Sequence, residues 1–215
     1  MIFFICSCQL LVIPSFSKNL HFDILINYTK KNYDQATLAR VEQWVNLIRQ
    51  SLSLNEFDKL YVANDFFNNN IRFSSDLSIW QQADYWATPL ETLNKTAGDC
   101  EDFSLAKYVS LLNMGVPSEK LRLVYVQARI AGSKKPIAHM VLAYYPDPNA
   151  SPYILDNLVQ TITRAENRKD LNPVFSFNAA SLWVTGKSKA YDSQQRLSKW
   201  QNALERINDQ GLIVN

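Results

Sequence analysis

Cysteine and histidine are scarce in this sequence of 215 residues, which contains three cysteines and two histidines. Two of the cysteines, Cys6 and Cys8, lie in an apolar segment at the N-terminus, so Cys100 is the only cysteine in the body of the chain. If that segment is removed, the remaining chain has one thiol and cannot form an internal disulfide bond. Any thiol chemistry of the mature protein then depends on Cys100.

An excess of one charge is also missing. Lysine and arginine number 22 against 20 aspartate and glutamate residues, which leaves a formal net charge of +2. The sequence has no basic block and no interleaving of basic and aromatic residues, so nothing in it favours a nucleic-acid partner. Internal repeats, low-complexity tracts and a phosphate-binding P-loop are absent as well. With 47% hydrophobic residues, the chain is long enough to bury the core of one compact domain.

Long hydrophobic runs are absent after the N-terminal segment. Residues 1–16 are mostly apolar and end at Ser15-Phe16-Ser17, a small-x-small pattern that is compatible with signal-peptide cleavage. No positively charged residues precede this apolar run, and the run is too short to span a bilayer. We expect residues 1–17 to be a signal peptide and the mature protein to have no membrane-inserted segment. A lone thiol in an exported protein favours catalysis.

Cys100 lies at a predicted helix start, within the segment TAGDCEDF of residues 96–103. A glycine turn leads into Asp99, and Asp102 three residues later completes the pattern of an acidic capping box. A helical apolar period follows at Leu105, Ala106, Val109 and Leu112. Cys100 is therefore expected in the first helical turn, where backbone N–H groups and the helix dipole favour a thiolate.

Three carboxylates, those of Asp99, Glu101 and Asp102, flank this thiol in the sequence. Nearby negative charges raise the pKa of a thiol, and a helix start offers only about half a positive charge against them. A bound divalent cation would remove this conflict, and Ca²⁺ suits a flexible set of oxygen ligands better than Zn²⁺ does. The spacing is not that of an EF-hand loop. The alternative is that these residues are ordinary cap acids that face water.

A nucleophilic cysteine needs a base, and His139 is the better placed of the two histidines. It begins an apolar run of strand length over residues 139–145, whereas His21 precedes the first convincing helix. Asp156 lies among strand-forming residues, where a carboxylate usually needs a partner, and it would orient the far nitrogen of a histidine. Each residue also has an ordinary alternative: a small buried thiol, a satisfied polar group and a turn aspartate.

The remaining patterns predict an α+β domain. Amphipathic helices are expected over residues 38–52 and 57–67, and a capping box with proline at the first helical position predicts a short helix over residues 88–95. Gly115 and Pro117 end the helix that begins at Cys100. Further elements are expected as strands over residues 121–130, 137–145 and 153–157, a segment at 181–185 and a helix over 191–208.

Several separated motifs together resemble the bacterial transglutaminase-like cysteine proteinases of the LapG type, over about residues 27–210. The motifs are DYWATP at 84–89, GDCEDF at 98–103, AKY at 106–108, HMVL at 139–142 and LDN at 155–157. The resemblance implies a single domain with a papain-like and transglutaminase-like core, in which N-terminal helices and a catalytic helix pack on an antiparallel sheet. It also implies a catalytic triad of Cys100, His139 and Asp156.

The same resemblance implies a calcium site beside the nucleophile, with Asp99, Glu101 and Asp102 as ligands. Proteins of this type act in the periplasm, where they cleave the N-terminal region of a large biofilm adhesin near a pair of alanines and release it from the cell surface. An inner-membrane receptor for cyclic di-GMP sequesters the protease. We therefore expect this adhesin as substrate, this receptor as partner and the periplasm as location.

The expected reaction is acyl transfer from a peptide to water. The backbone N–H of Cys100 is the best local donor to an oxyanion, and the indole N–H of Trp80 or Trp86 is a candidate second donor, although an aromatic residue in the Tyr85-Trp86 segment is more often part of the core. Two alternatives remain open at this point. A transglutaminase-type enzyme would pass the acyl group to an amine, and a non-catalytic module would use calcium to bind a peptide.

Overall fold

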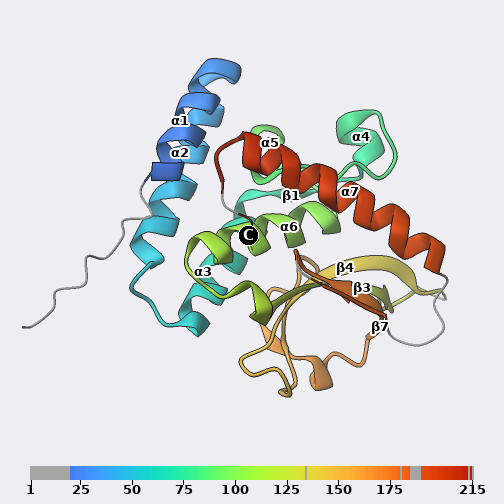
Figure 1. Ribbon diagram of the computed structural model, residues 1–215. Helices are drawn as coiled ribbons and strands as arrows, with labels where there is room; N and C mark the ends of the chain where they lie inside the picture. The colour runs from blue at the N-terminus through green and yellow to red at the C-terminus, as the bar shows by residue number, and fades with distance from the viewer. Residues whose placement is uncertain (1–19, 134, 180, 185–189, 213, 215) are drawn as a thin grey trace, which may run out of the picture.

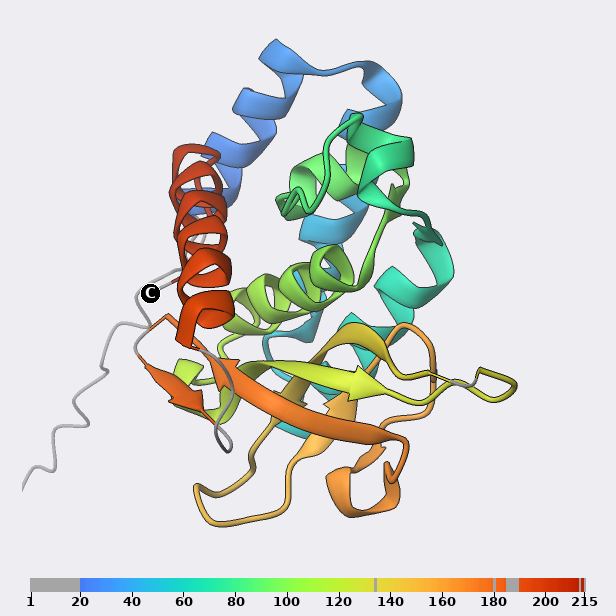
Figure 2. The ribbon, with the colours of Figure 1, turned by 90° about the vertical axis from the view of Figure 1, so that its right-hand side faces the viewer.

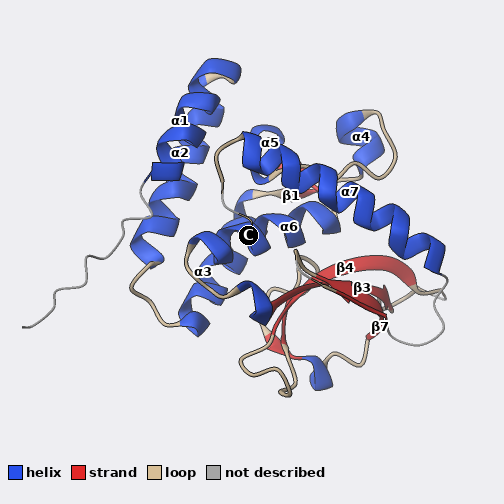
Figure 3. Cartoon of the chain, in the orientation of Figure 1, coloured by secondary structure: helices blue, strands red, loops and turns tan. Residues whose placement is uncertain are grey.

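The computed structural model describes residues 20–133, 135–179, 181–184, 190–212 and 214. In this part of the chain, a layer of helices covers one face of a six-stranded antiparallel sheet (Figure 1, Figure 3). The strand order in the sheet is β6-β5-β4-β3-β7-β8. The predicted α+β class, with helices packed on an antiparallel sheet, is confirmed.

The helices are α1 (Leu20–Asn32), α2 (Gln35–Ser51), α3 (Glu56–Asn70), α4 (Asp76–Trp80), α5 (Pro89–Lys95), α6 (Cys100–Asn113) and α7 (Ala190–Asp209). The strands of the sheet are β3 (Leu121–Ala128), β4 (Ile137–Tyr144), β5 (Tyr153–Leu155), β6 (Thr163–Arg164), β7 (Leu171–Phe177) and β8 (Leu182–Val184). Two further short strands, β1 (Arg72–Phe73) and β2 (Ala97–Gly98), pair in parallel. Short 3-10 helices lie at Ser118–Lys120 and Ala165–Asn167.

The central element is α6, which lies between the sheet and the other helices (Figure 2). Every residue of this helix from position 102 to 113 is buried, because β3 and β4 cover one side and α3 and α5 the other. The indole N–H of Trp44 in α2 donates to Ser110 Oγ at 2.8 Å, which satisfies a polar pair inside this core. Gly115 has a φ of 88° directly after α6, so the predicted glycine stop is confirmed.

Both predicted capping boxes form. Thr88 Oγ accepts from the Glu91 N–H at 3.2 Å, and the Glu91 carboxylate accepts from the Thr88 N–H at 2.7 Å. At the start of α6, the Asp99 and Asp102 side chains make the equivalent reciprocal bonds. A Cβ atom at position 98 would lie 2.8 Å from the Asp102 Cβ, so only glycine allows the chain to enter the helix beside this cap.

The predicted hairpin of β3 and β4 is confirmed and presents two different faces. Met140, Leu142 and Tyr144 of β4 pack into the main core under the helices. Val141 and Ala143 belong to a second apolar cluster with residues of β3 and β5. On its other edge, β4 pairs with β5 only from Leu142 to Tyr144, so His139 lies beyond the end of β5.

Several elements were not predicted, and α1 and β7 are the longest of them. Residues 20–32 form α1, so His21 lies within a helix rather than before the first one. β7 contains Pro173, which argues against a central strand, yet the β3–β7 ladder shifts register between Tyr125 and Val126, and Pro173 pairs with Val126 at this irregularity. The predicted signal peptide and Thr185 lie outside the described residues. No helix in the described ranges is long and apolar enough to cross a membrane.

Because α6 is enclosed on all sides, its core positions are expected to be sensitive to truncation. Leu105 is fully buried, so Leu105→Ala should lower the free energy of unfolding by about 2–5 kcal/mol through lost apolar burial and a residual cavity. Urea denaturation followed by circular dichroism measures this change. Leu52→Ala is the matched control, because Leu52 is 42% exposed. Equal unfolding midpoints for the two variants would contradict the role assigned to α6.

Candidate active site

His139 and Asp156 form a buried pair at the ends of β4 and β5. His139 Nε2 lies 2.8 Å from Asp156 Oδ1, and the two side chains are 2% and 0% exposed. Burial by itself raises the pKa of Asp156, but hydrogen bonds from His139, the Leu158 N–H and Arg168 outweigh it and lower the pKa to about 2. An ionised Asp156 carboxylate can only accept a hydrogen bond, so its partner, His139 Nε2, carries the imidazole proton. This assignment leaves Nδ1 as the basic nitrogen.

Cys100 is connected to the His139–Asp156 pair by contacts with Met140, the residue that follows His139. The thiol interacts with the backbone N–H of Met140, and one turn later Ser104 Oγ donates to the Met140 carbonyl oxygen at 3.2 Å. Both polar groups of Met140 therefore face the start of α6 at the edge of β4 that β5 leaves free. The fold thus brings together the helix start, β4 and the end of β5, which is the order of elements predicted for Cys100, His139 and Asp156.

Asp156 has further partners that the sequence did not reveal. Arg168 Nη2 donates to Asp156 Oδ2 at 2.7 Å, and the Leu158 N–H donates to Asp156 Oδ1 at 2.9 Å. Asn68 of α3 donates to the Asp156 carbonyl oxygen at 2.8 Å. Neither Arg168 nor Asn68 lies in a recognisable pattern, so only the packing of α3 and the loop after β6 against β5 identifies them.

A cluster of carboxylates lies at the start of α6 and includes one residue that sequence reasoning missed. Oxygen atoms of Asp76, Asp99 and Asp102 lie within 4.8 Å of one another, and the same holds for ligand atoms of Asp99, Cys100 and Glu101. Asp76 is the first residue of α4, which β1 and β2 bring next to α6. Its position 23 residues before Asp99 explains why no local spacing pointed to it.

The cluster is short of positive charge. Asp76 Oδ2 accepts from the Tyr85 N–H at 2.6 Å, but Asp76 Oδ1 is buried without a hydrogen-bond partner in the described structure. Burial and neighbouring carboxylates raise the pKa of Asp76 to about 6 and that of Asp99 to about 10. Within the described ranges, no lysine or arginine forms an ion pair with Asp76, Asp99 or Asp102. Hard oxygen ligands and an unpartnered carboxylate oxygen fit a calcium ion.

The predicted calcium ligands differ in how many of their carboxylate oxygens already accept hydrogen bonds. Asp102 uses one oxygen for the Ala87 N–H at 2.7 Å and the other for the Asp99 N–H at 3.2 Å, so its first role is to hold the helix start and the segment before α5. Asp99 Oδ1 accepts from the Glu101 N–H at 3.2 Å. Asp99, Glu101 and Asp102 as calcium ligands all stay a prediction.

The helix start alone does not hold Cys100 as a thiolate. Burial raises the pKa of the thiol, and the Glu101 and Asp99 charges raise it further, whereas the Met140 N–H lowers it. The thiol is half-buried and donates to Glu101 Oε2, with 2.6 Å between sulfur and oxygen. The conflict expected between the flanking acids and an anionic sulfur is therefore present in the structure, and a cation in the carboxylate cluster would relieve it.

The two tryptophans predicted as candidate oxyanion donors have different positions. The Trp86 indole N–H donates to Asp84 Oδ1 at 3.1 Å, and its ring packs against Phe177 and Trp200 in the core. Trp86 is thus a core residue, and its indole N–H is not available to an oxyanion because it already donates to Asp84. The Trp80 indole N–H is buried and has no hydrogen-bond partner among the described residues, so Trp80 remains a candidate.

Comparisons with known proteins agree with this geometry. The family described as bacterial transglutaminase-like cysteine proteinase matches residues 26–172. The chain is similar to the solved structure of Legionella pneumophila LapG, with 35% identity and a TM-score of 0.73 over 86% of this chain and 97% of that one. The EGTA-treated form of the Legionella protein is 34% identical, with a TM-score of 0.73 over 86% of this chain and 97% of that one. The calcium-bound form is 36% identical, with a TM-score of 0.71 over 85% of this chain and 97% of that one. No curated protein matches the chain.

Proposed function

The chain belongs to the bacterial transglutaminase-like cysteine proteinases and is therefore a cysteine endopeptidase, and we propose that Cys100, His139 and Asp156 are its catalytic nucleophile, base and orienting carboxylate. The observation that carries this assignment is the buried 2.8 Å contact between His139 and Asp156, next to the strand residue whose N–H faces the Cys100 thiol. A nucleophile, a base and a group that orients the base are the parts that acyl transfer requires.

Each side chain has a defined task in this reaction. His139 Nδ1 takes the proton of the Cys100 thiol, and the sulfur attacks the peptide carbonyl carbon to form a tetrahedral adduct. The imidazolium then gives its proton to the leaving amine as the C–N bond breaks, which leaves an acyl group on sulfur. His139 next takes a proton from water, whose oxygen attacks the acyl carbon. The C–S bond then breaks, the imidazolium returns the proton to the sulfur, and the thiol and a carboxylic acid are released. Asp156 keeps the imidazole in the required tautomer throughout.

Stabilisation of the tetrahedral adduct falls to backbone dipoles at the helix start. The Cys100 N–H belongs to the first turn of α6, where N–H groups are not used within the helix and point toward the N-terminal side. The adduct oxygen would accept from this N–H. The Trp80 indole N–H is the available candidate for a second hydrogen bond.

Calcium dependence is part of the proposal. Asp76, Asp99 and Glu101 would hold the ion, with Asp102 in the same cluster. When bound, Ca²⁺ would supply the positive charge that lowers the pKa of the neighbouring thiol. The fit of these oxygens to a hard cation supports this, and so does the calcium-bound form of the related Legionella LapG.

We propose that the substrate is the N-terminal region of a large biofilm adhesin, cleaved in the periplasm so that the adhesin leaves the cell surface. An inner-membrane receptor for cyclic di-GMP would sequester the protease. The motifs shared with the LapG type support this assignment, as does 35% identity to the Legionella protein over nearly its whole length.

Incubation of the purified protein with calcium and N-terminal fragments of large adhesins from the same genome tests this function. We expect one internal peptide bond to be cut, and mass spectrometry should find a free carboxylate at the new C-terminus. The reaction is repeated with an excess of a small primary amine, which should leave this product unchanged because water is the acceptor. An amine-linked C-terminus would indicate transglutaminase activity, and intact fragments would contradict the proposed substrate.

A further inference from the structure

Arg168 connects the proposed triad to the loop after β6. We propose that Arg168 is a positioning residue, whose guanidinium holds the Asp156 carboxylate in the orientation that accepts the His139 hydrogen bond. This inference rests on the proposed function, because it assigns Arg168 to the same site. Arg168 itself would touch neither the substrate nor the reacting sulfur.

Both oxygens of Asp156 are committed to fixed donors. Oδ1 is shared by His139 Nε2 and the Leu158 N–H, and Oδ2 accepts from Arg168 Nη2 at 2.7 Å. Rotation of the carboxylate would break bonds at both oxygens at once. Because the Asp156 side chain is fully buried and that of Arg168 is 7% exposed, water does not replace a lost partner without rearrangement of the surrounding chain.

Arg168 is itself held from the opposite side. Its Nε and Nη2 donate to the Asp170 carboxylate at 3.0 and 2.7 Å. The Asp170 side chain is 37% exposed, so the guanidinium bridges a buried and a solvated carboxylate. This arrangement uses the planar fork of arginine, which a lysine ammonium does not reproduce.

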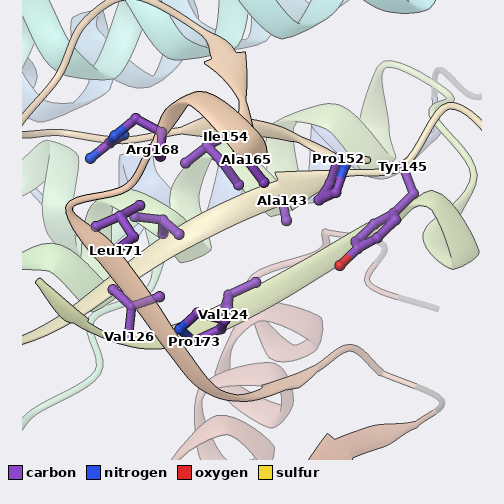
Figure 4. A pocket seen from close by; sticks show the side chains of 11 residues that line it. Val124, Val126, Ala143, Tyr145, Pro152, Ile154, Ala165, Arg168, Leu171 and Pro173 are labelled. Carbon is purple, nitrogen blue, oxygen red and sulfur yellow. The ribbon is translucent and has the colours of Figure 1, made fainter. Parts of the chain in front are cut away.

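The environment of Arg168 strengthens its ion pair with Asp156. Arg168 lies at one end of a cavity of about 270 Å³ whose other lining residues are almost all apolar, among them Ile154, Ala165 and Leu171 (Figure 4). Few polar groups are available there to screen the charges. The ion pair therefore keeps more of its strength than an exposed pair would.

No other cation has the same access to Asp156 in the described structure. The charged and titratable groups that face it include the carboxylate of Asp170 and three basic side chains, those of His139, Arg168 and Lys107 of α6. Lys107 is buried, its Nζ has no hydrogen-bond partner in the described ranges, and burial lowers its pKa to about 7. Lys107 therefore supplies only part of a charge near neutral pH, whereas Arg168 stays charged and bonds the carboxylate directly.

The test compares Arg168→Gln, Arg168→Lys and the control Lys169→Gln in the full chain with calcium present. Arg168→Gln should lower kcat about 10- to 100-fold, since a small displacement of a catalytic group has effects of this size, and should leave KM within about twofold. Arg168→Lys should give an intermediate kcat. Lys169→Gln removes one positive charge from the exposed neighbouring residue and leaves Arg168 and its two carboxylate partners unchanged, so kcat should change less than about threefold.

A second readout does not depend on activity. The chain has only two histidines, so nitrogen NMR of ¹⁵N-histidine-labelled protein reports the protonated nitrogen of His139 directly. We expect a pure Nε2–H tautomer in the wild type and a mixture in Arg168→Gln. A folded Arg168→Gln variant with unchanged kcat and tautomer would overturn the inference. If Arg168→Gln does not fold, Arg168→Lys decides, and wild-type kcat and tautomer in that variant would contradict it.

Failure of this inference is distinct from failure of the proposed function. If Cys100→Ala still cleaves the peptide, the triad assignment is wrong whatever the Arg168 variants do. If Cys100→Ala is inactive while Arg168→Gln keeps both its kcat and its His139 tautomer, the triad stands and the role of Arg168 is wrong.

Discussion

Cys100→Ala is expected to lower the rate of peptide cleavage by about 10⁴-fold or more, because no other nucleophile replaces the sulfur and the acyl intermediate is not formed. The substitution removes one atom from a half-buried side chain, so the fold should be retained. Cleavage is followed by mass spectrometry, and thermal unfolding by circular dichroism confirms that the variant is folded. Binding of an uncleaved substrate fragment should persist, since the change leaves the backbone of α6 and β4 in place.

The same variant separates an enzyme from a calcium-dependent binding module. In cells, a protease with Cys100→Ala should lose its whole effect on adhesin release. A binding module would keep that effect, because peptide binding does not need the sulfur. Full release of the adhesin by a folded Cys100→Ala variant is the outcome that would end the catalytic interpretation.

Removal of calcium is expected to abolish cleavage while most of the fold is retained. The carboxylates of Asp99 and Glu101 then lie beside the thiol without a balancing charge, and burial together with these two neighbours raises the thiol pKa. The rate of iodoacetamide labelling at Cys100 should therefore fall in excess EGTA and recover when calcium is restored. Far-ultraviolet circular dichroism should change little, since α6 is enclosed by packing rather than by the ion.

Asp76→Asn tests whether Asp76 is one of the calcium ligands. It should weaken calcium binding measured by calorimetry, and in EGTA it should be at least as stable as the wild type, because one of several repelling buried charges is gone. Asp23→Asn is the control, since the Asp23 side chain is 77% exposed and distant in sequence from the cluster. Full activity in excess chelator would remove calcium from the mechanism, and unchanged calcium affinity in Asp76→Asn would remove Asp76 from the site.

Local patterns predicted the elements of the site well where short-range interactions decide the structure. The capping box of Asp99 and Asp102 depends on residues three positions apart, and it placed Cys100 in the first turn of α6 as observed. The apolar, strand-forming composition of residues 121–130 and 137–145 predicted β3 and β4 within two residues. No strand was predicted over residues 171–177, and β7 contains Pro173 at a local irregularity of the β3–β7 ladder.

The thiolate expected at the helix start shows the limit of local electrostatic reasoning. Cys100 lies in the first turn of α6 as predicted, but burial, Glu101 and Asp99 raise the pKa of its thiol. Burial depends on how β4 and the helical layer enclose the residue. The direction of the shift in the pKa of the Cys100 thiol therefore followed only from the tertiary packing.

By itself, the sequence determined which residues have the chemistry: one thiol outside the N-terminal segment, one histidine at a strand, and acids around a helix start. These follow from residue types and from contacts within one helical turn. Only the tertiary structure decided that His139 meets Asp156, that Arg168 holds that carboxylate, that Asp76 joins the acids of α6, and that Trp86 belongs to the core. Such pairs are separated by twelve residues or more or come from different elements, and packing of the helical layer and the loops against the sheet, not local spacing, sets the distance between them.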